Sequence, residues 1–381
     1  MILENIFIFL FLILFPFGQI IRLSFDFLGA SIPVQPIDII VGLGALYAVF
    51  KNYRKPEIFR FIISFLNVAI FSYMISVFIF NTQNVIYGLF YLVRLASYFC
   101  FLIYVWNFVK ENAKNKKLLI DSLLVVSVTS AVFGWVQFFT VPDLKALTIY
   151  GWDMHLFRLV GTFLDPAFLG LILVFGLIIS IYKFLENKKW KWIVLIIFLL
   201  LSLAFTYSRA SYLAFAAGIL TVIYFMPKFK KLFFLVIGLA VIALILPTAK
   251  NHSIGLFRTF SAVDRIENYK STLNIFSKSP LFGVGYDNMC IAYQKYIGPQ
   301  DFSSHACSGS DSSLLFILAT TGIVGFIVFV RLIVNLARLV NPKFIAAPAL
   351  AMLVHSLFSN SLFYPWIMGY MVILLSISLK E

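Results

Sequence analysis

Charged residues are scarce in this chain, and their scarcity excludes most soluble classes of protein. They make up 12% of the sequence, against 62% hydrophobic residues, whereas a soluble domain is about 25% charged. A formal charge of +14 in a soluble protein would suggest a nucleic-acid partner. Here most of that charge lies in short loops between apolar segments, so we expect no nucleic-acid partner and contact with membrane lipids instead.

The patterns that hold metals or nucleotides are also missing. Only four histidines occur, and none has the close His, Asp or Glu spacing of a metal site, so we expect neither a metal nor another cofactor. No GxGxxG, Walker loop or DxD pair is found, which argues against nucleotide-driven or nucleotide-sugar chemistry. No cleavable signal is expected, because Met1 is followed by Glu4 rather than by a basic stretch.

The chain has three cysteines. Cys100 lies in an apolar run, where we expect it to pack. Cys290 and Cys307 fall in a long polar segment that would face an oxidising compartment. A bridge between them would close a loop of about 17 residues and contribute around 3 kcal/mol. Two unpaired thiols are the alternative.

Basic residues gather in clusters that alternate with long apolar segments. The clusters are Lys51, Arg54, Lys55 and Arg60; Lys110, Lys114, Lys116 and Lys117; Lys183, Lys188, Lys189 and Lys191; Lys228, Lys230 and Lys231; and Arg331, Arg338 and Lys343. Between consecutive clusters there is room for two membrane crossings of roughly 20 residues each. Because Lys and Arg are retained on the cytoplasmic side, every second loop is expected inside, with both termini in the cytoplasm.

This pattern predicts an all-α protein, a single integral membrane domain over residues 1–381 with about twelve transmembrane helices. The expected helices cover residues 3–22, 34–50, 61–80, 85–109, 118–140, 166–184, 192–207, 210–226, 232–248, 313–334, 344–359 and 362–379. Residues 250–312 are expected to form one long extracytoplasmic loop. Within it, FSAVDRIENYKSTLNIFSK is typical of an amphipathic helix, which Pro280 would end.

Arginines on the expected outer side are candidates for binding an anion. Arg209 lies in the turn TYSRAS, Arg158 precedes the sequence GTF, and Arg258 and Arg265 lie in the long loop. An arginine fork binds phosphate in a bidentate way and keeps its charge, so such a cluster would suit a lipid-linked pyrophosphate. In the alternative interpretation, each arginine pairs with a local carboxylate such as Asp165 or extends to lipid headgroups.

One arginine, Arg94, lies inside an apolar run, VIYGLFYLVRLASYF. A lone arginine at the centre of a bilayer costs roughly 3 kcal/mol on insertion scales. Two interpretations are open: Arg94 binds a buried carboxylate or carbonyl, or it lines the substrate cavity.

Candidate general bases stand where the long loop returns to the membrane, in SSHACSGSDSSLLFILATTGIVG. A hydroxyl that attacks an anomeric carbon gains from a base within hydrogen-bond reach, and both His305 and Asp311 are placed to supply one. Asp311 is equally suited to be the N-cap or first-turn acid of the following helix. His305 could equally be a solvated loop histidine.

Four stretches carry a family resemblance: RLVGTFLDPAFLG (158–170), TYSRASYLAFAAG (206–218), SPLFGVGYDN (279–288) and DSSLLFILATTGIVG (311–325). In this order and spacing, the chain resembles the O-antigen ligase and polymerase superfamily of bacterial envelope enzymes. The resemblance implies a GT-C-like membrane fold in the bacterial cytoplasmic membrane with the active site outside. It also implies metal-independent transfer of a glycan from an undecaprenyl-pyrophosphate carrier to a lipid, glycan or protein acceptor.

The resemblance also implies roles for individual residues. Arg209 matches the arginine of the S-R motif that holds the pyrophosphate in ligases, and Arg265 is the better match for their loop arginine. Asp311 stands where ligases carry a histidine, eleven residues before Gly322. This departure leaves room for a polymerase or a protein-glycan ligase, with Asp311 or His305 as the base. A transporter or flippase is the competing class, but the sequence shows no internal repeat of the kind expected there.

Overall fold

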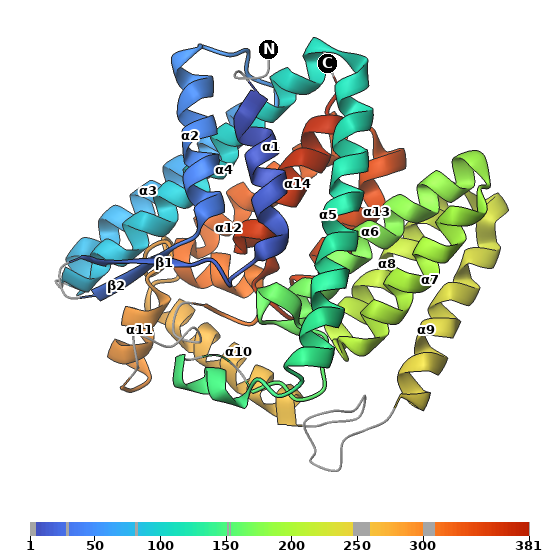
Figure 1. Cartoon of the computed structure of the whole chain (residues 1–381). Coiled ribbons are helices and arrows are strands. Elements are labelled where there is room, and N and C mark those ends of the chain that lie inside the picture. The colour runs from blue at the N-terminus through green and yellow to red at the C-terminus, as the bar shows by residue number, and fades with distance from the viewer. Residues whose placement is uncertain are drawn as a thin grey trace. The chain divides into compact units, whose positions relative to one another are not determined.

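A computed structural model describes residues 5–27, 30–80, 83–150, 152, 154–246, 260–299 and 309–380. These residues form fourteen α-helices and one β-hairpin (Figure 1). The expectation of a polytopic helical protein is therefore confirmed, and each expected helix has a counterpart. The number of twelve crossings and the GT-C-like architecture stay predictions.

The chain divides into two compact units, and each is assembled from three separate stretches. Unit 1 comprises Met1–Ile21, Glu111–Thr259 and Asn341–His355, and unit 2 comprises Arg22–Lys110, Phe260–Val340 and Ser356–Glu381. Packing between residues far apart in sequence therefore builds each core. The single integral membrane domain over residues 1–381 stays a prediction.

Unit 1 is built around one helix, α6, that is apolar over most of its length. Its helices are α1 (Ile6–Leu14), α5 (Ala113–Thr140), α6 (Pro166–Asn187), α7 (Trp190–Phe205), α8 (Arg209–Phe225), α9 (Phe233–Ile245) and α13 (Pro342–His355). α6 contacts α5, α7, α8 and α13, and every residue from Leu169 to Ile181 is buried. A helix that is apolar all round belongs inside a bundle. Small residues let its neighbours approach closely, because a Cβ added at Gly170 would overlap Ser211.

The first helix is shorter than expected. α1 ends at Leu14 rather than near residue 22, and a short 3-10 helix over Phe15–Phe17 follows it. Pro16 and Gly18, whose φ is +53°, break the helical path. The Gln19 N–H then donates to the Thr162 carbonyl over 2.8 Å, so the chain is redirected by a tertiary contact.

Unit 2 combines a hairpin with the longer helices. The hairpin pairs β1 (Leu23–Phe27) antiparallel with β2 (Ala30–Val34), with Leu23 opposite Val34. The helices are α2 (Pro36–Phe50), α3 (Phe59–Phe80), α4 (Ile86–Glu111), α10 (Phe260–Lys278), α11 (Met289–Tyr296), α12 (Ser313–Leu339) and α14 (Pro365–Ser378). α12 packs against α3 and α10. The hairpin was not expected from the sequence.

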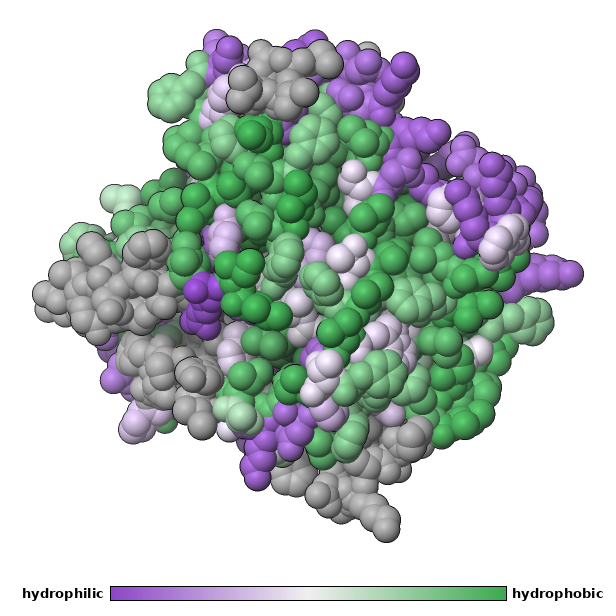
Figure 2. Space-filling model, viewed as in Figure 1, coloured by the Kyte–Doolittle hydropathy of each residue, from purple (hydrophilic) through white to green (hydrophobic). Residues whose placement is uncertain are grey.

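The surface has the character of a membrane protein. Among the described residues, five helices are long and apolar enough to cross a bilayer: α3, α4, α5, α6 and α12. Large apolar side chains are exposed, including Phe50 at 84% and Phe78 at 86%, and Figure 2 shows hydrophobic residues over much of the visible surface. Soluble monomers rarely expose contiguous apolar surface of this extent, so lipid is the solvent of these helices.

The segment expected as a long outer loop contains ordered elements. α10 spans Phe260–Lys278, which confirms the expected amphipathic helix, and it ends before Pro280. α11, which was not expected, follows at Met289–Tyr296. Residues 250–259 and 300–308 of this segment lie outside the described residues. The extracytoplasmic location of the loop stays a prediction.

Candidate functional site

In unit 1, Arg209 is the first residue of α8 and follows a sharply bent turn. Tyr207 has a left-handed φ of +50°, and Ser208 caps the helix, its Oγ accepting from the Ser211 N–H over 3.3 Å. The arginine is therefore half-buried at a helix N-terminus. The helix dipole favours an anion at such a position, and a guanidinium adds a full positive charge.

Arg158 binds the backbone of that turn. Its Nε donates to the Thr206 carbonyl over 3.0 Å and its Nη2 to the Tyr207 carbonyl over 3.3 Å. The side chain is buried, with 6% of its surface exposed. Arg158 thus holds the backbone that presents Arg209. A direct contact between Arg158 and pyrophosphate stays a prediction.

The rest of the motif at 158–170 is also anchored. Gln137 Oε1 accepts from the Val160 and Gly161 N–H groups over 3.1 and 3.2 Å. Asp165 caps α6, its Oδ1 accepting from Ala167 N–H over 2.6 Å and from Phe168 N–H over 3.1 Å. These contacts explain the sequence LDP as a capping aspartate followed by proline at the first helical position.

A buried serine and histidine cluster links α8 to α13. Ser211 Oγ lies 2.8 Å from Ser208 Oγ and 3.2 Å from His355 Nε2, and it donates to the Ala167 carbonyl over 3.1 Å. Ser211 and His355 have no exposed surface. Sequence reasoning did not single out His355, because the only signal was one polar residue at the end of an apolar helix.

In unit 2, the motif at 279–288 packs against the motif at 311–325. α12 is interrupted at Gly322, whose φ is +67°, and the segment 279–288 lies against the break. Ile323 N–H donates to the Pro280 carbonyl over 2.9 Å, and Gly285 N–H donates to the Thr320 carbonyl over 3.0 Å. A Cβ at Gly322 would overlap the Leu281 carbonyl, so only glycine allows this approach.

Asp311 lies just before α12, where α10 fixes the backbone. Its N–H donates to Asn268 Oδ1 over 2.9 Å, and the neighbouring Ser310 Oγ donates to the same oxygen over 3.3 Å. The N-cap of α12 is Ser312 rather than Asp311, with the Ser312 Oγ accepting from Leu315 N–H. The capping explanation for Asp311 is therefore wrong.

Arg265 and Asp311 converge on one tyrosine of α10. Burial raises the pKa of Tyr269, the Arg265 guanidinium lowers it and the Asp311 carboxylate raises it further. The Asp311 N–H binds Asn268, the residue before Tyr269, and the Tyr269 hydroxyl donates to the Leu357 carbonyl over 2.6 Å. Arg265 precedes Tyr269 by one helical turn, which places the two on one face of α10. Unit 2 thus brings two predicted site residues into one neighbourhood.

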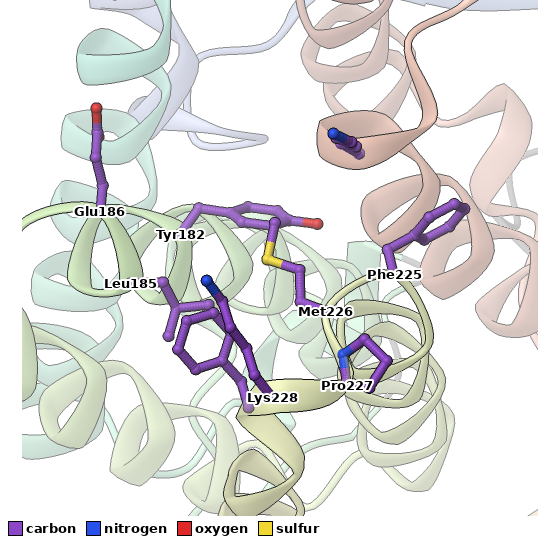
Figure 3. A pocket seen from close by; sticks show the side chains of 9 residues that line it. Tyr182, Leu185, Glu186, Phe225, Met226, Pro227 and Lys228 are labelled. Carbon is purple, nitrogen blue, oxygen red and sulfur yellow. The ribbon is translucent and has the colours of Figure 1, made fainter.

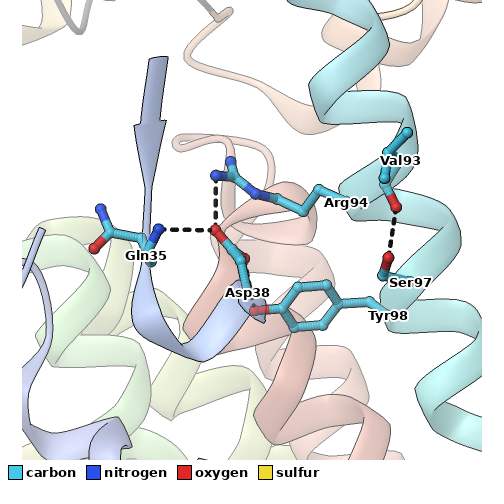
Figure 4. Close-up of polar contacts among 6 residues, drawn as sticks. All are labelled: Gln35, Asp38, Val93, Arg94, Ser97 and Tyr98. Atoms are coloured by element: carbon cyan, nitrogen blue, oxygen red, sulfur yellow. Dashed lines mark hydrogen bonds and ion pairs between the residues drawn. The ribbon is translucent and has the colours of Figure 1, made fainter. Parts of the chain in front are cut away.

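Arg94 binds a carboxylate whose side chain is 11% exposed, in keeping with one of its two expected roles. Its Nη2 lies 2.8 Å from Asp38 Oδ2, and the Tyr98 hydroxyl donates to Asp38 Oδ1 over 3.2 Å (Figure 4). The backbone N–H of Gln35 also donates to Oδ2, over 3.3 Å. This network joins α2 to α4 within unit 2 and neutralises a charge that would be costly in a membrane.

The remaining candidates fall partly outside the described residues. His305 and Arg258 both lie there, as does Cys307, so their predicted roles stay predictions. Cys290 is disulfide-bonded and Cys100 is a free thiol.

Comparison with known proteins agrees with the motifs. No curated protein matches the chain. Residues 193–330 match a family model described as O-antigen ligase. This segment contains Arg209, α10, residues 279–288 and the first part of α12, whereas the motif at 158–170 precedes it. The resemblance expected from the sequence is therefore confirmed: over residues 193–330, the chain is O-antigen ligase-like.

Proposed function

We propose that this protein transfers a glycan from an undecaprenyl-pyrophosphate carrier to an acceptor hydroxyl at the outer face of the bacterial cytoplasmic membrane. The observation that carries the proposal is Arg209, held at the N-terminus of α8 by a capped and arginine-supported turn. This residue belongs to the segment that matches the O-antigen ligase family. Both termini are proposed to be cytoplasmic, as the charge pattern predicts.

In this proposal, arginines stabilise the leaving group. The bond between the anomeric carbon and the phosphate oxygen breaks, and negative charge develops on the departing undecaprenyl pyrophosphate. Arg209, at the positive end of the α8 dipole, would bind that charge, as preorganised positive groups do in other transfer reactions. Arg265 and Arg258 are proposed to contribute from the long loop. The reaction is proposed to be metal-independent, since these fixed positive charges can neutralise the pyrophosphate.

Asp311 is proposed to assist the acceptor. The acceptor oxygen forms the new bond to the anomeric carbon, and its proton passes to a carboxylate or imidazole within hydrogen-bond reach. Asp311 suits this role because Asn268 fixes its backbone and Ser312 takes the capping function. His305 is the alternative base.

Polymerisation is the second candidate function. In that reaction the acceptor hydroxyl belongs to another lipid-linked repeat unit rather than to a separate molecule. It is favoured by one observation, that Asp311 occupies the position where ligases carry a histidine. The proposed bond changes are the same in both reactions, so product analysis must separate them.

The test is a transfer assay with the purified full-length protein and an undecaprenyl-pyrophosphate oligosaccharide, without added metal or nucleotide. Wild type is compared with Arg209→Ala, Arg265→Ala and Asp311→Ala, and with Arg338→Ala, which changes an exposed arginine at the end of α12. We expect loss of transfer in the first three variants and full activity in the fourth. Product attached to a separate acceptor indicates a ligase, and a lengthened carrier-linked glycan indicates a polymerase. Full activity of Arg209→Ala would refute the proposed role of this residue. If neither wild type nor any variant shows turnover, a transporter is favoured.

A further inference from the structure

Unit 1 contains a pocket that none of the motifs above involves. It has a volume of about 550 Å³ and lies where the ends of α6 and α8 meet the beginning of α13 (Figure 3). Ligand sites in proteins commonly measure about 300–1,000 Å³. Leu185, Phe225 and Met226 supply apolar walls, and the polar lining includes Tyr182, Lys228 and Lys343.

The donors of the pocket have no acidic or hydrogen-bonded partner among the described residues. Within the described part of the chain, neither the Lys228 nor the Lys343 ammonium forms an ion pair, and the Tyr182 hydroxyl makes no hydrogen bond. The Tyr182 ring is held by Phe344, with 5.5 Å between the ring centroids. The one acidic lining residue, Glu186, extends away from Tyr182 and Lys228 in Figure 3. Two ammonium groups and one hydroxyl are therefore hydrogen-bond donors in the lining of the pocket.

Further positive charge surrounds this opening. The Lys188 ammonium lies 4.7 Å from the centroid of the Phe229 ring, and Lys228 lies 5.0 Å from the same ring. Lys230 and Lys231 follow in the same connection and are exposed. These lysines belong to the loops that the charge pattern predicts to be cytoplasmic, where anionic lipid headgroups are concentrated.

We propose that this pocket binds the phosphate headgroup of an anionic phospholipid. The phosphate oxygens would accept from Lys228, Lys343 and the Tyr182 hydroxyl, and the glycerol and upper acyl carbons would cover the apolar walls. A free phosphate ion would use the donors but leave the apolar walls in water. The lipid therefore fits both parts of the lining. The proposal is independent of the glycan-transfer reaction, because no residue assigned to that reaction lines the pocket.

The experiment measures the thermal unfolding midpoint of the purified full-length protein in neutral detergent. Short-chain phosphatidylglycerol, short-chain phosphatidylcholine and inorganic phosphate are titrated separately, because a ligand that binds only the folded state raises this midpoint. Lys228→Gln/Lys343→Gln is the test variant, and Lys230→Gln/Lys231→Gln is the control with the same loss of charge in the same region. Tyr182→Phe removes the hydroxyl without changing the charge.

We expect phosphatidylglycerol to raise the midpoint of wild type and of the control variant, and phosphatidylcholine to raise neither. The Lys228→Gln/Lys343→Gln variant should bind phosphatidylglycerol roughly 30-fold more weakly, and Tyr182→Phe about fivefold more weakly. Unchanged affinity in the pocket variant would overturn the proposal, as would an equal loss in the control, which would indicate general attraction to charge. Stabilisation by inorganic phosphate as strong as that by phosphatidylglycerol would overturn the assignment to a lipid.

Discussion

The Arg158 guanidinium holds the turn that presents Arg209. Arg158 Nε donates to the Thr206 carbonyl over 3.0 Å, two residues before the capping Ser208. Arg158 and Arg209 therefore differ in kind: Arg158 is buried and bound to backbone, and Arg209 lies at a helix N-terminus, where an anion is favoured.

This difference predicts opposite effects of two alanine variants. Arg158→Ala leaves two carbonyls without their donors, so we expect it to lower the free energy of unfolding by roughly 3 kcal/mol. Arg209→Ala should abolish glycan transfer while the thermal midpoint stays close to that of wild type. Thermal unfolding and the transfer assay on both variants measure the contrast. If Arg158→Ala unfolds like wild type and yet fails to transfer, Arg158 acts on the substrate directly.

The contact between Ser211 and His355 predicts coupling between α8 and α13. Their 3.2 Å contact is fully buried, so Ser211→Ala and His355→Leu should each destabilise the fold. Because both changes remove the same hydrogen bond, the double variant should be more stable than the sum of the single losses predicts, by about 1 kcal/mol. A double-mutant cycle on unfolding free energies measures this coupling. Strict additivity would show that the contact contributes nothing.

The Arg94 and Asp38 pair predicts a large cost for removing one partner. Side-chain exposure is 17% for Arg94 and 11% for Asp38, and an isolated buried charge is costly. Arg94→Leu should lower stability by about 3–5 kcal/mol, and the double variant Arg94→Leu/Asp38→Leu should recover most of that loss.

The chain provides a matched control for this pair. Arg60 and Glu57 also form an ion pair, at 2.6 Å, but their side chains are 66% and 55% exposed. Arg60→Leu should therefore cost less than about 1 kcal/mol. Equal losses for Arg60→Leu and Arg94→Leu would show that burial does not govern the strength of the Arg94 pair.

The break in α12 at Gly322 lets us predict how an added side chain there would change stability. Alanine there would need a left-handed backbone and would overlap the Leu281 carbonyl, so Gly322→Ala should destabilise the protein by at least about 2 kcal/mol. A Cβ at Gly238 in α9 meets no atom within 4 Å, and Gly238→Ala should be neutral or slightly stabilising. Thermal unfolding of the two variants makes the comparison. If Gly322→Ala unfolds at the same temperature as wild type, the segment 279–288 and α12 are not held together at this residue.

Local signals predicted the helices well, because apolar runs and charge clusters are properties of neighbouring residues. α10 is the clearest case, since its amphipathic period and Pro280 both lie in the sequence itself. The break at Gly322 was not predicted, because glycine is frequent inside membrane helices and the residue that requires it, Leu281, lies far upstream. For the same reason, the sequence alone could not choose between the two roles of Arg94.

The candidate site shows the same limit. Asp311 and Ser312 are both good capping residues, and only the geometry shows that Ser312 performs the capping. Arg158 and Arg209 were both candidates for binding pyrophosphate, and only the structure shows that Arg158 binds the Thr206 and Tyr207 carbonyls of the turn before Arg209. Long-range contacts separate positioning residues from candidate binding residues.

Asp287 predicts a pH-dependent stability. Its φ is +59° and its buried Oδ2 has no hydrogen-bond partner among the described residues. Burial raises the pKa of Asp287 well above its ordinary value, and the Arg94 guanidinium only partly opposes this. The folded state therefore keeps a proton that the unfolded chain releases above about pH 4, so the contribution of Asp287 to stability is present below that pH and is lost as pH rises.

Asp287→Asn, which tolerates the left-handed backbone, should flatten the fall of the thermal midpoint between pH 4 and pH 8 and raise the midpoint at the upper end. Asp264→Asn, at an exposed position of α10, should leave the slope as it is in wild type. Parallel curves for wild type and Asp287→Asn would show that this carboxyl is already ionised in the folded protein.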